Sequence, residues 1–369
     1  MGSSNTDAVH IGILGAAEIA RKQCRSFAKY LSQPPYSNTV RLVAIASRDI
    51  DKAQRMIDEW GLNDRVKAYG AYQDLLDDAN IHAVYIPLPT SLHVEWVGKA
   101  AAAGKHILLE KPVAVTAEDT DTILSLCDKF GVFLMDGTMW MHHARTKDVE
   151  QRIFARHEAM LGKIVEVVST FSFFAPEAFR AVDIRFKRDG DPLGCLGDVG
   201  WYCIRAILWA YRFEAPIAVQ AHAGPEFNEQ GVPVSIGGTV LFENNRRGTF
   251  TCSFDRALWD RFEIGGTDGT LVVENFVIPS KELEEKYYYY HDHGLIEAHS
   301  QDVTRCDTIV VKSEIPQEAA MWLEFARCVK SVRAGEGVDR SWAAVAALTQ
   351  KTLCAVMHSA QNRCCVVDL

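Results

Sequence analysis

The sequence predicts two domains of different architecture: an α/β domain on a doubly wound parallel sheet, then an α+β domain with a large, mostly antiparallel open sheet. Residues 9–136 alternate short Val, Ile and Leu runs with helix-like segments, as parallel strands buried on both faces do. After about residue 145 the runs alternate apolar with polar residues, as half-wetted antiparallel strands do. A chain of 369 residues also exceeds one comfortable core. We therefore predict domains at 1–140 and 141–369, with the C-terminal helices free to pack back on the first domain.

The first half of the chain contains repeated strand–helix units. Strands are predicted at 9–14, 42–47, 83–88, 106–110 and 132–136. Helices are predicted at 17–32, 49–60, 71–78, 91–103 and 117–130. This repetition favours a parallel sheet with right-handed crossovers. Ligands of such sheets bind beyond the carboxyl ends of the strands, so the loops that follow the strands are the place to search for a site.

The second half contains the antiparallel pattern. Strands are predicted at 163–174, 217–224, 237–244, 247–255, 261–275 and 307–313, with turn residues such as Asn244-Asn245 and Asp268-Gly269 between them. Long helices are predicted at 197–213, 316–333 and 341–361. The run Tyr287–Tyr290 predicts an edge or interface strand, because tyrosine suits half-wet surfaces.

The composition excludes several classes of protein. The formal net charge of −9 argues against a nucleic-acid-binding surface, which needs a basic patch. No run of about 18 apolar residues occurs, so no membrane span is expected. The start, MGSSNTDAVH, lacks the basic and apolar regions of a secretory signal. The ten cysteines contain no CxxC pair and are expected to be reduced thiols, so we predict a cytoplasmic protein.

The first predicted strand ends in GILGAAEIARK (residues 12–22). A dinucleotide-binding (Rossmann) turn has the pattern G-x-G-x-x-G, and here only the first glycine is kept. A purely structural turn is the alternative. The turn nevertheless follows a strand and opens the first βαβ unit, and free N–H groups at such a helix start attract a phosphate. The predicted cofactor-binding residues are Gly15, Ala16, Ala17, Glu18 and Ile19.

The second predicted strand ends in AIASRDIDKA (residues 44–53). A site that prefers NAD carries Asp or Glu at this strand tip, to hold the ribose hydroxyls. Here Ser47 and Arg48 stand there, and a hydroxyl with a guanidinium suits a 2′-phosphate. We therefore predict NADP as the cofactor, with NAD possible. The alternative is that Arg48 is a solvated arginine and Asp49 a helix N-cap.

Two further strand ends carry candidate residues. Leu88, Pro89, Thr90 and His93 follow the strand at 83–88, and Glu110-Lys111 follows the strand at 106–110. A lysine ammonium near a nicotinamide can polarise a substrate oxygen. Pro112 restricts the backbone of Lys111 to extended conformations. A surface ion pair is the alternative for Glu110-Lys111, and a water-bound histidine at a helix start is the alternative for His93.

A second chemical set lies in GCLGDVGWYCIRAILWAYR (194–212), which is glycine-rich at its start and then predicts an amphipathic helix. Asp198 and Tyr202 are four residues apart, so they share a face of the first turn. Alone, Asp198 would be a helix cap and Tyr202 a core aromatic residue. With Lys111 they would form a proton-transfer set, because an ammonium favours the ionised form of a nearby tyrosine.

These residues resemble the glucose–fructose oxidoreductase / inositol dehydrogenase / MocA-like family of NAD(P) oxidoreductases. The matching pieces are GILGAAEIA, AIASR, IPLPTSLHVEWVGKAAAAGKHILLEKPVAV and GDVGWYC, in that order. The resemblance implies an N-terminal Rossmann domain and a C-terminal open-sheet domain through which two chains pair. It also implies a catalytic lysine at Lys111, with its partners at Asp198 and Tyr202. Tyrosine rather than histidine at 202 resembles the branch of dimeric dihydrodiol dehydrogenase and NADP-dependent D-xylose dehydrogenase.

The sequence departs from that family in MDGTMWMHHAR (135–145). Many relatives have a tyrosine–arginine–phenylalanine–histidine run there, whereas this chain has Trp140, Met141, His142 and His143. Met141 therefore stands where those relatives have the arginine. The pair His142-His143 and the triplet His291-Asp292-His293 are alternative metal ligands, but neither has helix-spaced partners, so we predict no metal. Phe171, Phe173 and Phe174 are expected to line the substrate pocket or to form a core strand.

These observations predict an NADP-dependent dehydrogenase or reductase acting on CH–OH groups. Hydride would pass between the nicotinamide and a carbinol or carbonyl carbon of a small polyol, aldose or cyclic diol. Lys111, Tyr202 and Asp198 would be the catalytic residues, and the protein would be a homodimer. A non-catalytic nucleotide sensor or regulator is the alternative, motivated by the missing glycines and by Met141. A scaffold that uses the open sheet as an interface is a third.

Overall fold

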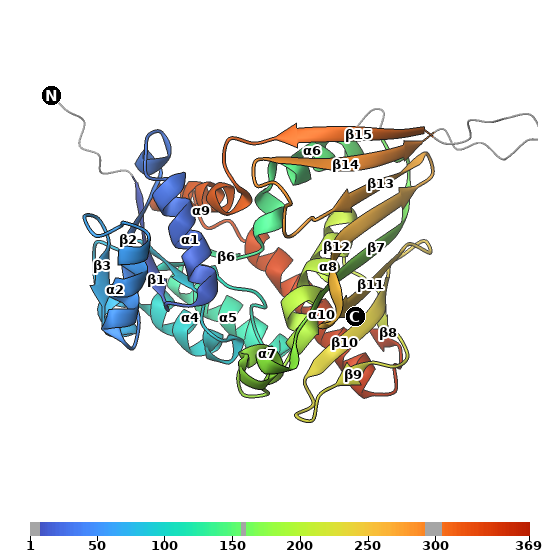
Figure 1. Ribbon diagram of the computed structural model, residues 1–369, viewed down its shortest axis with the longest axis horizontal. Helices are drawn as coiled ribbons and strands as arrows, with labels where there is room; N and C mark the ends of the chain where they lie inside the picture. The colour runs from blue at the N-terminus through green and yellow to red at the C-terminus, as the bar shows by residue number, and fades with distance from the viewer. Residues whose placement is uncertain (1–7, 156–159, 292–304) are drawn as a thin grey trace, which may run out of the picture. The chain divides into compact units, whose positions relative to one another are not determined.

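The computed structural model describes residues 8–155, 160–291 and 305–369 of the chain (Figure 1). The chain divides into two compact units. The first unit contains Met1–His142 and Ile315–Ala347, and the second contains His143–Glu314 and Leu348–Leu369. The boundary at 140/141 drawn from the sequence stays a prediction of domain organisation.

The first unit is built on a six-stranded sheet whose neighbouring strands are all parallel. The strands are β1 (Val9–Leu14), β2 (Val40–Ala46), β3 (Lys67–Tyr69), β4 (Ala83–Ile86), β5 (His106–Leu109) and β6 (Leu134–Asp136). Their order is β3-β2-β1-β4-β5-β6, so the direction of winding reverses between β1 and β4. The predicted doubly wound parallel sheet is confirmed. Every residue of β4 and β5 is buried, which explains their uninterrupted apolar sequence.

Helices connect these strands: α1 (Glu18–Lys29), α2 (Ile50–Glu59), α3 (Tyr72–Leu76), α4 (His93–Ala102) and α5 (Ala117–Phe130). Local rules explain where α5 begins and ends. The Thr116 hydroxyl accepts a hydrogen bond from the Asp119 N–H at 3.0 Å, and Gly131 ends the helix with φ of 65°. A later helix, α9 (Gln317–Arg333), also belongs to this unit, where the Trp322 indole donates to Gln23 Oε1 at 2.7 Å.

The second unit contains a ten-stranded sheet with the order β15-β14-β13-β12-β7-β11-β10-β8-β16, and β9 pairs with β10 (Figure 1). The paired strands are antiparallel except for β7 and β11. This confirms the predicted large, mostly antiparallel sheet. The strands are β7 (Ile164–Phe174), β8 (Ala218–Ala221), β9 (Glu226–Phe227), β10 (Pro233–Leu241), β11 (Arg247–Ser253), β12 (Asp255–Gly266), β13 (Gly269–Glu274), β14 (Glu284–His291), β15 (Arg305–Lys312) and β16 (Val367–Asp368).

The remaining helices are α6 (Ala144–Ile153), α7 (Glu177–Val182), α8 (Trp201–Ala210) and α10 (Ser341–Gln361). Short helical turns are η1 (Tyr36–Asn38), η2 (Thr90–Leu92), η3 (Met139–His142), η4 (Ile184–Phe186) and the π-helical η5 (Leu196–Gly200). No helix in the described ranges has the length and apolar character needed to cross a membrane.

Two local features differ from the expectations drawn from the sequence. The tyrosine run was expected in an edge or interface strand. It lies in β14, which is not an edge strand because β15 pairs along its outer side, and the interface alternative stays a prediction. The Tyr287 ring is fully buried and its hydroxyl donates to Asp148 Oδ2 at 2.5 Å. The helix α8 is also not amphipathic: all ten of its residues are buried. The sheet strands β7 and β11 cover one side of α8, and α10 supplies a partner on another, where Arg205 Nε donates to Thr349 Oγ1 at 2.7 Å.

Candidate active site

The turn after β1 is shaped for close approach to a ligand. Gly15 has φ of 124°, and a Cβ atom there would lie 3.0 Å from Leu88 Cδ2, so both conformation and space favour glycine. Ala17 is the N-cap of α1 and offers no side-chain hydrogen bond to the helix start. The first N–H groups of α1 are therefore not capped by a side chain, which is the arrangement that receives a phosphate. Glu18 is exposed and pairs with Arg21 at 3.1 Å.

The turn after β2 carries the residues that predicted NADP. Ser47 is buried, and its hydroxyl accepts a hydrogen bond from the Asp49 N–H at 3.3 Å. Asp49 caps α2 by accepting from the Asp51 N–H at 3.0 Å, as the alternative reading expected. Arg48 is exposed, and its charge opposes the rise that burial produces in the pKa of Tyr72. The Arg48 guanidinium therefore lies near the Tyr72 hydroxyl at the end of β2. The neighbouring carboxylate, Asp49, is occupied as the cap of α2.

The loop after β4 is tied to the loop after β5 by one histidine. His93 is fully buried; its Nε2 lies 2.9 Å from the Leu88 carbonyl oxygen and its Nδ1 lies 3.1 Å from that of Val113. Burial lowers the pKa of His93. The ring joins two loops at this edge and does not face solvent. Leu88 and Thr90 are buried as well. The Leu88 side chain lies against Gly15.

The tip of β5 explains the charged pair at the end of an apolar strand. Glu110 is 8% exposed, and its carboxylate accepts hydrogen bonds from the Tyr85 hydroxyl and from the Lys111 N–H, the latter at 3.1 Å. Burial raises the pKa of Glu110. Gly137 leaves room for this carboxylate, since a Cβ there would lie 2.9 Å from Glu110 Oε1. The Lys111–Pro112 peptide bond is cis. Glu110 is thus an internal support, and Lys111 is the partly exposed member of the pair.

All predicted cofactor residues therefore follow carboxyl ends of neighbouring strands of one parallel sheet. The contact between Gly15 and Leu88 brings the loops after β1 and β4 together at the reversal of strand order. This is where dinucleotides bind in such sheets. The uncapped start of α1 would receive the pyrophosphate, and the Ser47-Arg48 turn would face the ribose. Cofactor binding by these individual residues stays a prediction.

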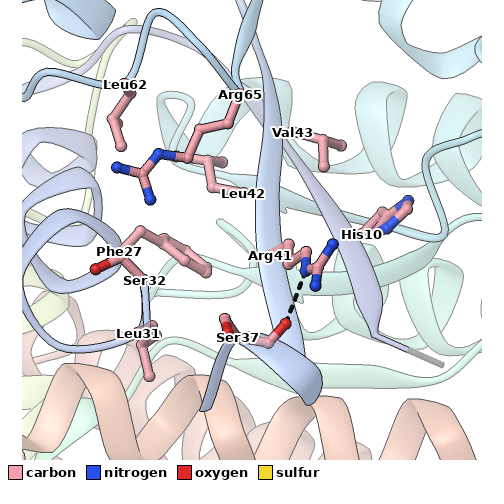
Figure 2. A pocket seen from close by; sticks show the side chains of 10 residues that line it. All are labelled: His10, Phe27, Leu31, Ser32, Ser37, Arg41, Leu42, Val43, Leu62 and Arg65. Carbon is pink, nitrogen blue, oxygen red and sulfur yellow. Dashed lines mark hydrogen bonds between the residues drawn. The ribbon is translucent and has the colours of Figure 1, made fainter. Parts of the chain in front are cut away.

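A pocket of about 360 Å³ lies elsewhere in the first unit (Figure 2). It is lined by residues from the amino-terminal parts of β1 and β2, from the end of α1, and from the segments that follow α1 and α2: His10, Phe27, Leu31, Ser32, Ser37, Arg41, Leu42, Val43, Leu62 and Arg65. Arg41 Nε donates to the Ser37 carbonyl oxygen at 2.7 Å. None of the predicted site residues lines this pocket, which lies toward the opposite edge of the sheet from the Gly15 turn.

The second unit holds Asp198 and Tyr202 at the start of α8. Asp198 lies in the π-helical turn η5, and π-helical turns occur frequently at functional sites. The turn is wedged against β11: a Cβ at Gly200 would lie 2.9 Å from Cys252 Sγ. Tyr202 is 5% exposed, and its ring lies 5.8 Å from that of Phe171. The buried Phe171 thus supports the predicted catalytic tyrosine, whereas Phe174 is exposed.

Sequence reasoning missed the partner of Asp198. Arg185 Nε donates to Asp198 Oδ2 at 2.8 Å, and Arg185 Nη1 lies 3.1 Å from Asp183 Oδ1. The Asp198 charge, followed by that of Asp183, raises the pKa of Arg185. Arg185 precedes Asp198 by 13 residues in an irregular segment, so no helical or strand period links them. The only sequence signal was the D-x-R spacing of Asp183 and Arg185.

The histidine pairs have packing and capping roles. His142 stacks on Trp342 with ring centroids 4.9 Å apart. His143 caps α6 by accepting from the Arg145 N–H at 2.9 Å. His291 lies 3.1 Å from Asp307, while Asp292 and His293 lie outside the described residues. Within the ranges that the structure covers, no three His, Cys, Asp or Glu side chains are grouped to hold a metal ion.

Comparison with known proteins identifies the family. Residues 9–138 match the model of the GFO/IDH/MocA oxidoreductase family with an NAD-binding Rossmann fold, and residues 155–272 match the GFO/IDH/MocA C-terminal domain. The chain is 33% identical over 260 residues to D-xylose 1-dehydrogenase (NADP(+)) 2 of Haloferax volcanii, covering 70% of this chain and 74% of that one. It is 27% identical over 274 residues to trans-1,2-dihydrobenzene-1,2-diol dehydrogenase of Mus musculus, covering 74% and 77%.

A solved structure agrees along nearly the whole chain. The 3-ketoreductase of Actinomadura kijaniata, in complex with NADP and TDP-benzene, superposes with a TM-score of 0.77 at 25% identity, covering 95% of this chain and 97% of that one. The predicted family and branch are confirmed by these relatives. The chain belongs to the GFO/IDH/MocA family and is an oxidoreductase.

Proposed function

We propose that this oxidoreductase uses NADP and acts on a carbinol or carbonyl carbon of a small polyol, aldose or cyclic diol. The observation that carries the proposal is the retention, in a chain of this family, of Lys111 at the carboxyl edge of the parallel sheet and of Tyr202 one turn after Asp198. The names of the relatives support this substrate range, since they act on a pentose and on a cyclic diol. Retention of all three residues argues against the non-catalytic sensor.

The choice of NADP over NAD rests on two supports. One relative is named for NADP(+), and the 3-ketoreductase structure contains NADP. In this chain, Arg48 stands at the tip of β2, where an NAD-preferring site has a carboxylate. Asp49 is occupied as the N-cap of α2. A guanidinium at this position forms charged hydrogen bonds with a 2′-phosphate, which are stronger than the neutral-acceptor hydrogen bonds it could donate to a free ribose hydroxyl.

When bound, NADP would supply the hydride chemistry, and the side chains of this chain would move the proton. When an alcohol is oxidised, the Tyr202 phenolate accepts the hydroxyl proton. The Lys111 ammonium favours that phenolate and stabilises the developing alkoxide. Asp198 orients Lys111 or a substrate hydroxyl. General acid–base help of this kind supplies about 10²–10⁴-fold in rate. The mechanism requires Lys111 of the first unit and Tyr202 of the second to meet over the cofactor.

The test is the variant Lys111→Ala, with Lys99→Ala as the matched control. Lys99 is an exposed lysine of the same unit that pairs with Glu95 at 2.5 Å. The single-turnover rate of NADP reduction with D-xylose should fall at least about 10²-fold in Lys111→Ala. It should stay near the wild-type rate in Lys99→Ala, and both variants should still bind NADP. A near-wild-type rate for Lys111→Ala would remove the lysine from the mechanism.

We also propose that two chains pair through the sheet of the second unit, in a cytoplasmic protein. Val168, on the central strand β7, is 40% exposed, and Thr170 and Thr251 lie beside each other across β7 and β11 with their hydroxyls 3.2 Å apart. Exposed β-branched residues in mid-sheet suit a sheet-to-sheet contact. All ten cysteines are free thiols, as in proteins of reducing compartments. Sedimentation equilibrium tests the pairing, and a monomer at all concentrations would exclude it.

A further inference from the structure

The ion pair of Arg185 and Asp198 has a geometry that suits substrate recognition. Arg185 uses Nε for Asp198 and Nη1 for both carboxylate oxygens of Asp183, at 3.1 and 3.2 Å. The side chains of Asp198 and Asp183 are 13% and 19% exposed, and that of Arg185 is 37% exposed. The charges are therefore partly shielded from water, where a charged hydrogen bond is stronger than at an open surface.

Both members of the pair are held by the fold. Asp183 accepts a hydrogen bond from the Arg185 N–H at 3.0 Å and so caps η4. The next residue, Phe186, is buried and lies 5.0 Å from the ring of Phe254. On the other side, the close approach of Gly200 to Cys252 fixes η5 against β11. An arginine on one anchored turn thus reaches an aspartate on another, and neither needs to move to form the pair.

One donor of Arg185 remains available. Its Nη2 donates no hydrogen bond to any residue in the described ranges. The guanidinium therefore presents a spare N–H donor next to a carboxylate that it already holds. A carboxylate accepts from hydroxyl groups, and a guanidinium N–H donates to hydroxyl or carbonyl oxygens. Side by side, the two groups match two neighbouring oxygens of one small molecule.

We infer that Arg185 is a positioning residue for Asp198, and that the two together recognise a pair of vicinal oxygens on the substrate. This inference rests on the proposed function. Asp198 accepts a hydrogen bond from one substrate hydroxyl, and Arg185 Nη2 donates to the oxygen on the adjacent carbon. Because Asp198 already has a cationic partner in its own unit, its role is to hold the substrate, and proton transfer is left to Tyr202. The substrate class is narrowed to 1,2-diols and 2-hydroxycarbonyl compounds, which include aldoses, inositols and cyclic 1,2-diols but exclude diols whose hydroxyl groups are not on adjacent carbons.

The experiment compares D-glucose with 2-deoxy-D-glucose. The deoxy sugar lacks the hydroxyl group on C2, the carbon next to the reacting C1. For the wild-type enzyme with NADP, the KM for the deoxy sugar should be at least about tenfold higher. The deoxy sugar lacks one of the two oxygens and therefore loses a charged hydrogen bond to Asp198 or Arg185. Arg185→Ala should raise the KM for D-glucose by about tenfold, with kcat changed far less, and should bring the two sugars close to equal. Arg185→Lys should recover only part of the discrimination between the two sugars, because an ammonium lacks the planar set of N–H donors of a guanidinium.

The control is Arg180→Ala, which removes an arginine of the preceding helix that pairs with Asp255. It should leave the ratio of the two KM values unchanged even if it lowers the melting temperature. Ligand-observed NMR with NADP present measures the binding of the same sugars without turnover. The inference is overturned if Arg185→Ala keeps the wild-type ratio, or if the wild-type enzyme does not distinguish the two sugars by KM or by binding. The Lys111→Ala result is independent of these outcomes, so failure of the proposed function is recognised separately.

Discussion

The two units bring different kinds of chemistry to the proposed site. In the first unit the groups proposed to face the ligand at the turn after β1 are backbone N–H groups, made accessible by Gly15 and by the uncapped start of α1. In the second unit the proposed groups are side chains: Asp198 is held by an ion pair with Arg185, and the Tyr202 ring packs beside that of Phe171. Ala17 and Ala20 stand at the second and third glycine positions of the G-x-G-x-x-G pattern, and we expect a backbone site to tolerate them. We expect a site of paired side chains to be sensitive to the loss of either partner.

Replacement of the tyrosine should have the largest effect. Tyr202→Phe keeps the ring that packs 5.8 Å from Phe171 and removes only the hydroxyl. The rate of hydride transfer should fall about 10²–10⁴-fold, with little change in melting temperature. Cys203→Ser, at the adjacent buried position, is the control for disturbance of α8. A Tyr202→Phe enzyme within a few-fold of wild type would shift the proton transfer to another group.

Acidification should weaken both units through buried histidines, and His106 in the first unit and His143 in the second allow the effect to be tested. His106 Nδ1 accepts from the Phe133 N–H at 3.0 Å, and His143 Nδ1 accepts from the Arg145 N–H at 2.9 Å. Burial lowers the pKa of both histidines to about 4. The unfolded chain takes up a proton near pH 6.5, so stability is full above that pH and falls as the pH drops toward 4. The loss is at most about 3 kcal/mol for each histidine.

Chemical denaturation between pH 7 and 4 measures this effect. His106→Gln and His143→Gln should each flatten the acid limb of the stability curve. The exposed His358 supplies the control, since His358→Gln should leave the limb unchanged. An acid limb that is the same in all four proteins would assign the loss to other groups.

Replacement of Arg48 should have a smaller effect, confined to the choice of cofactor. Arg48→Ala removes the guanidinium at the tip of β2 and should weaken NADP by about tenfold relative to NAD. Arg55→Ala, which removes a surface partner of Asp49, is the matched control. Fluorescence titration with each cofactor gives the ratio of the dissociation constants for NADP and NAD. An unchanged ratio in Arg48→Ala would mean that the 2′-phosphate is held elsewhere.

The sequence predicted the parts of the fold that depend on neighbours along the chain. The strands β1, β4 and β5 are apolar runs buried on both faces, and Asp49 is a cap because capping is a local contact. The three-residue β3 was missed because only one of its residues is buried. The tyrosine strand was expected at an edge or an interface, and it is not at an edge because β15, a strand distant in sequence, pairs with its outer side.

The candidate site divides in the same way. The turn residues follow from strand ends and glycine positions, which the sequence displays. The Arg185–Asp198 pair joins two irregular segments that only the folded second unit brings together. The hydrogen bond from Tyr85 to Glu110 could not be predicted either, since it joins residues distant in sequence. In the sequence, Tyr85 is indistinguishable from the other apolar residues of a buried strand. Long-range polar contacts leave no period in a sequence.

The central claim is that Lys111 and Tyr202 act together on one substrate carbon. A crystal structure with bound NADP and a non-reactive polyol tests it most directly. The account predicts Lys111 Nζ and Tyr202 Oη within hydrogen-bonding reach of the same substrate oxygen, close to the reactive carbon of the nicotinamide. A closed complex in which the two groups contact different parts of the ligand, with neither at the reacting carbon, would contradict it.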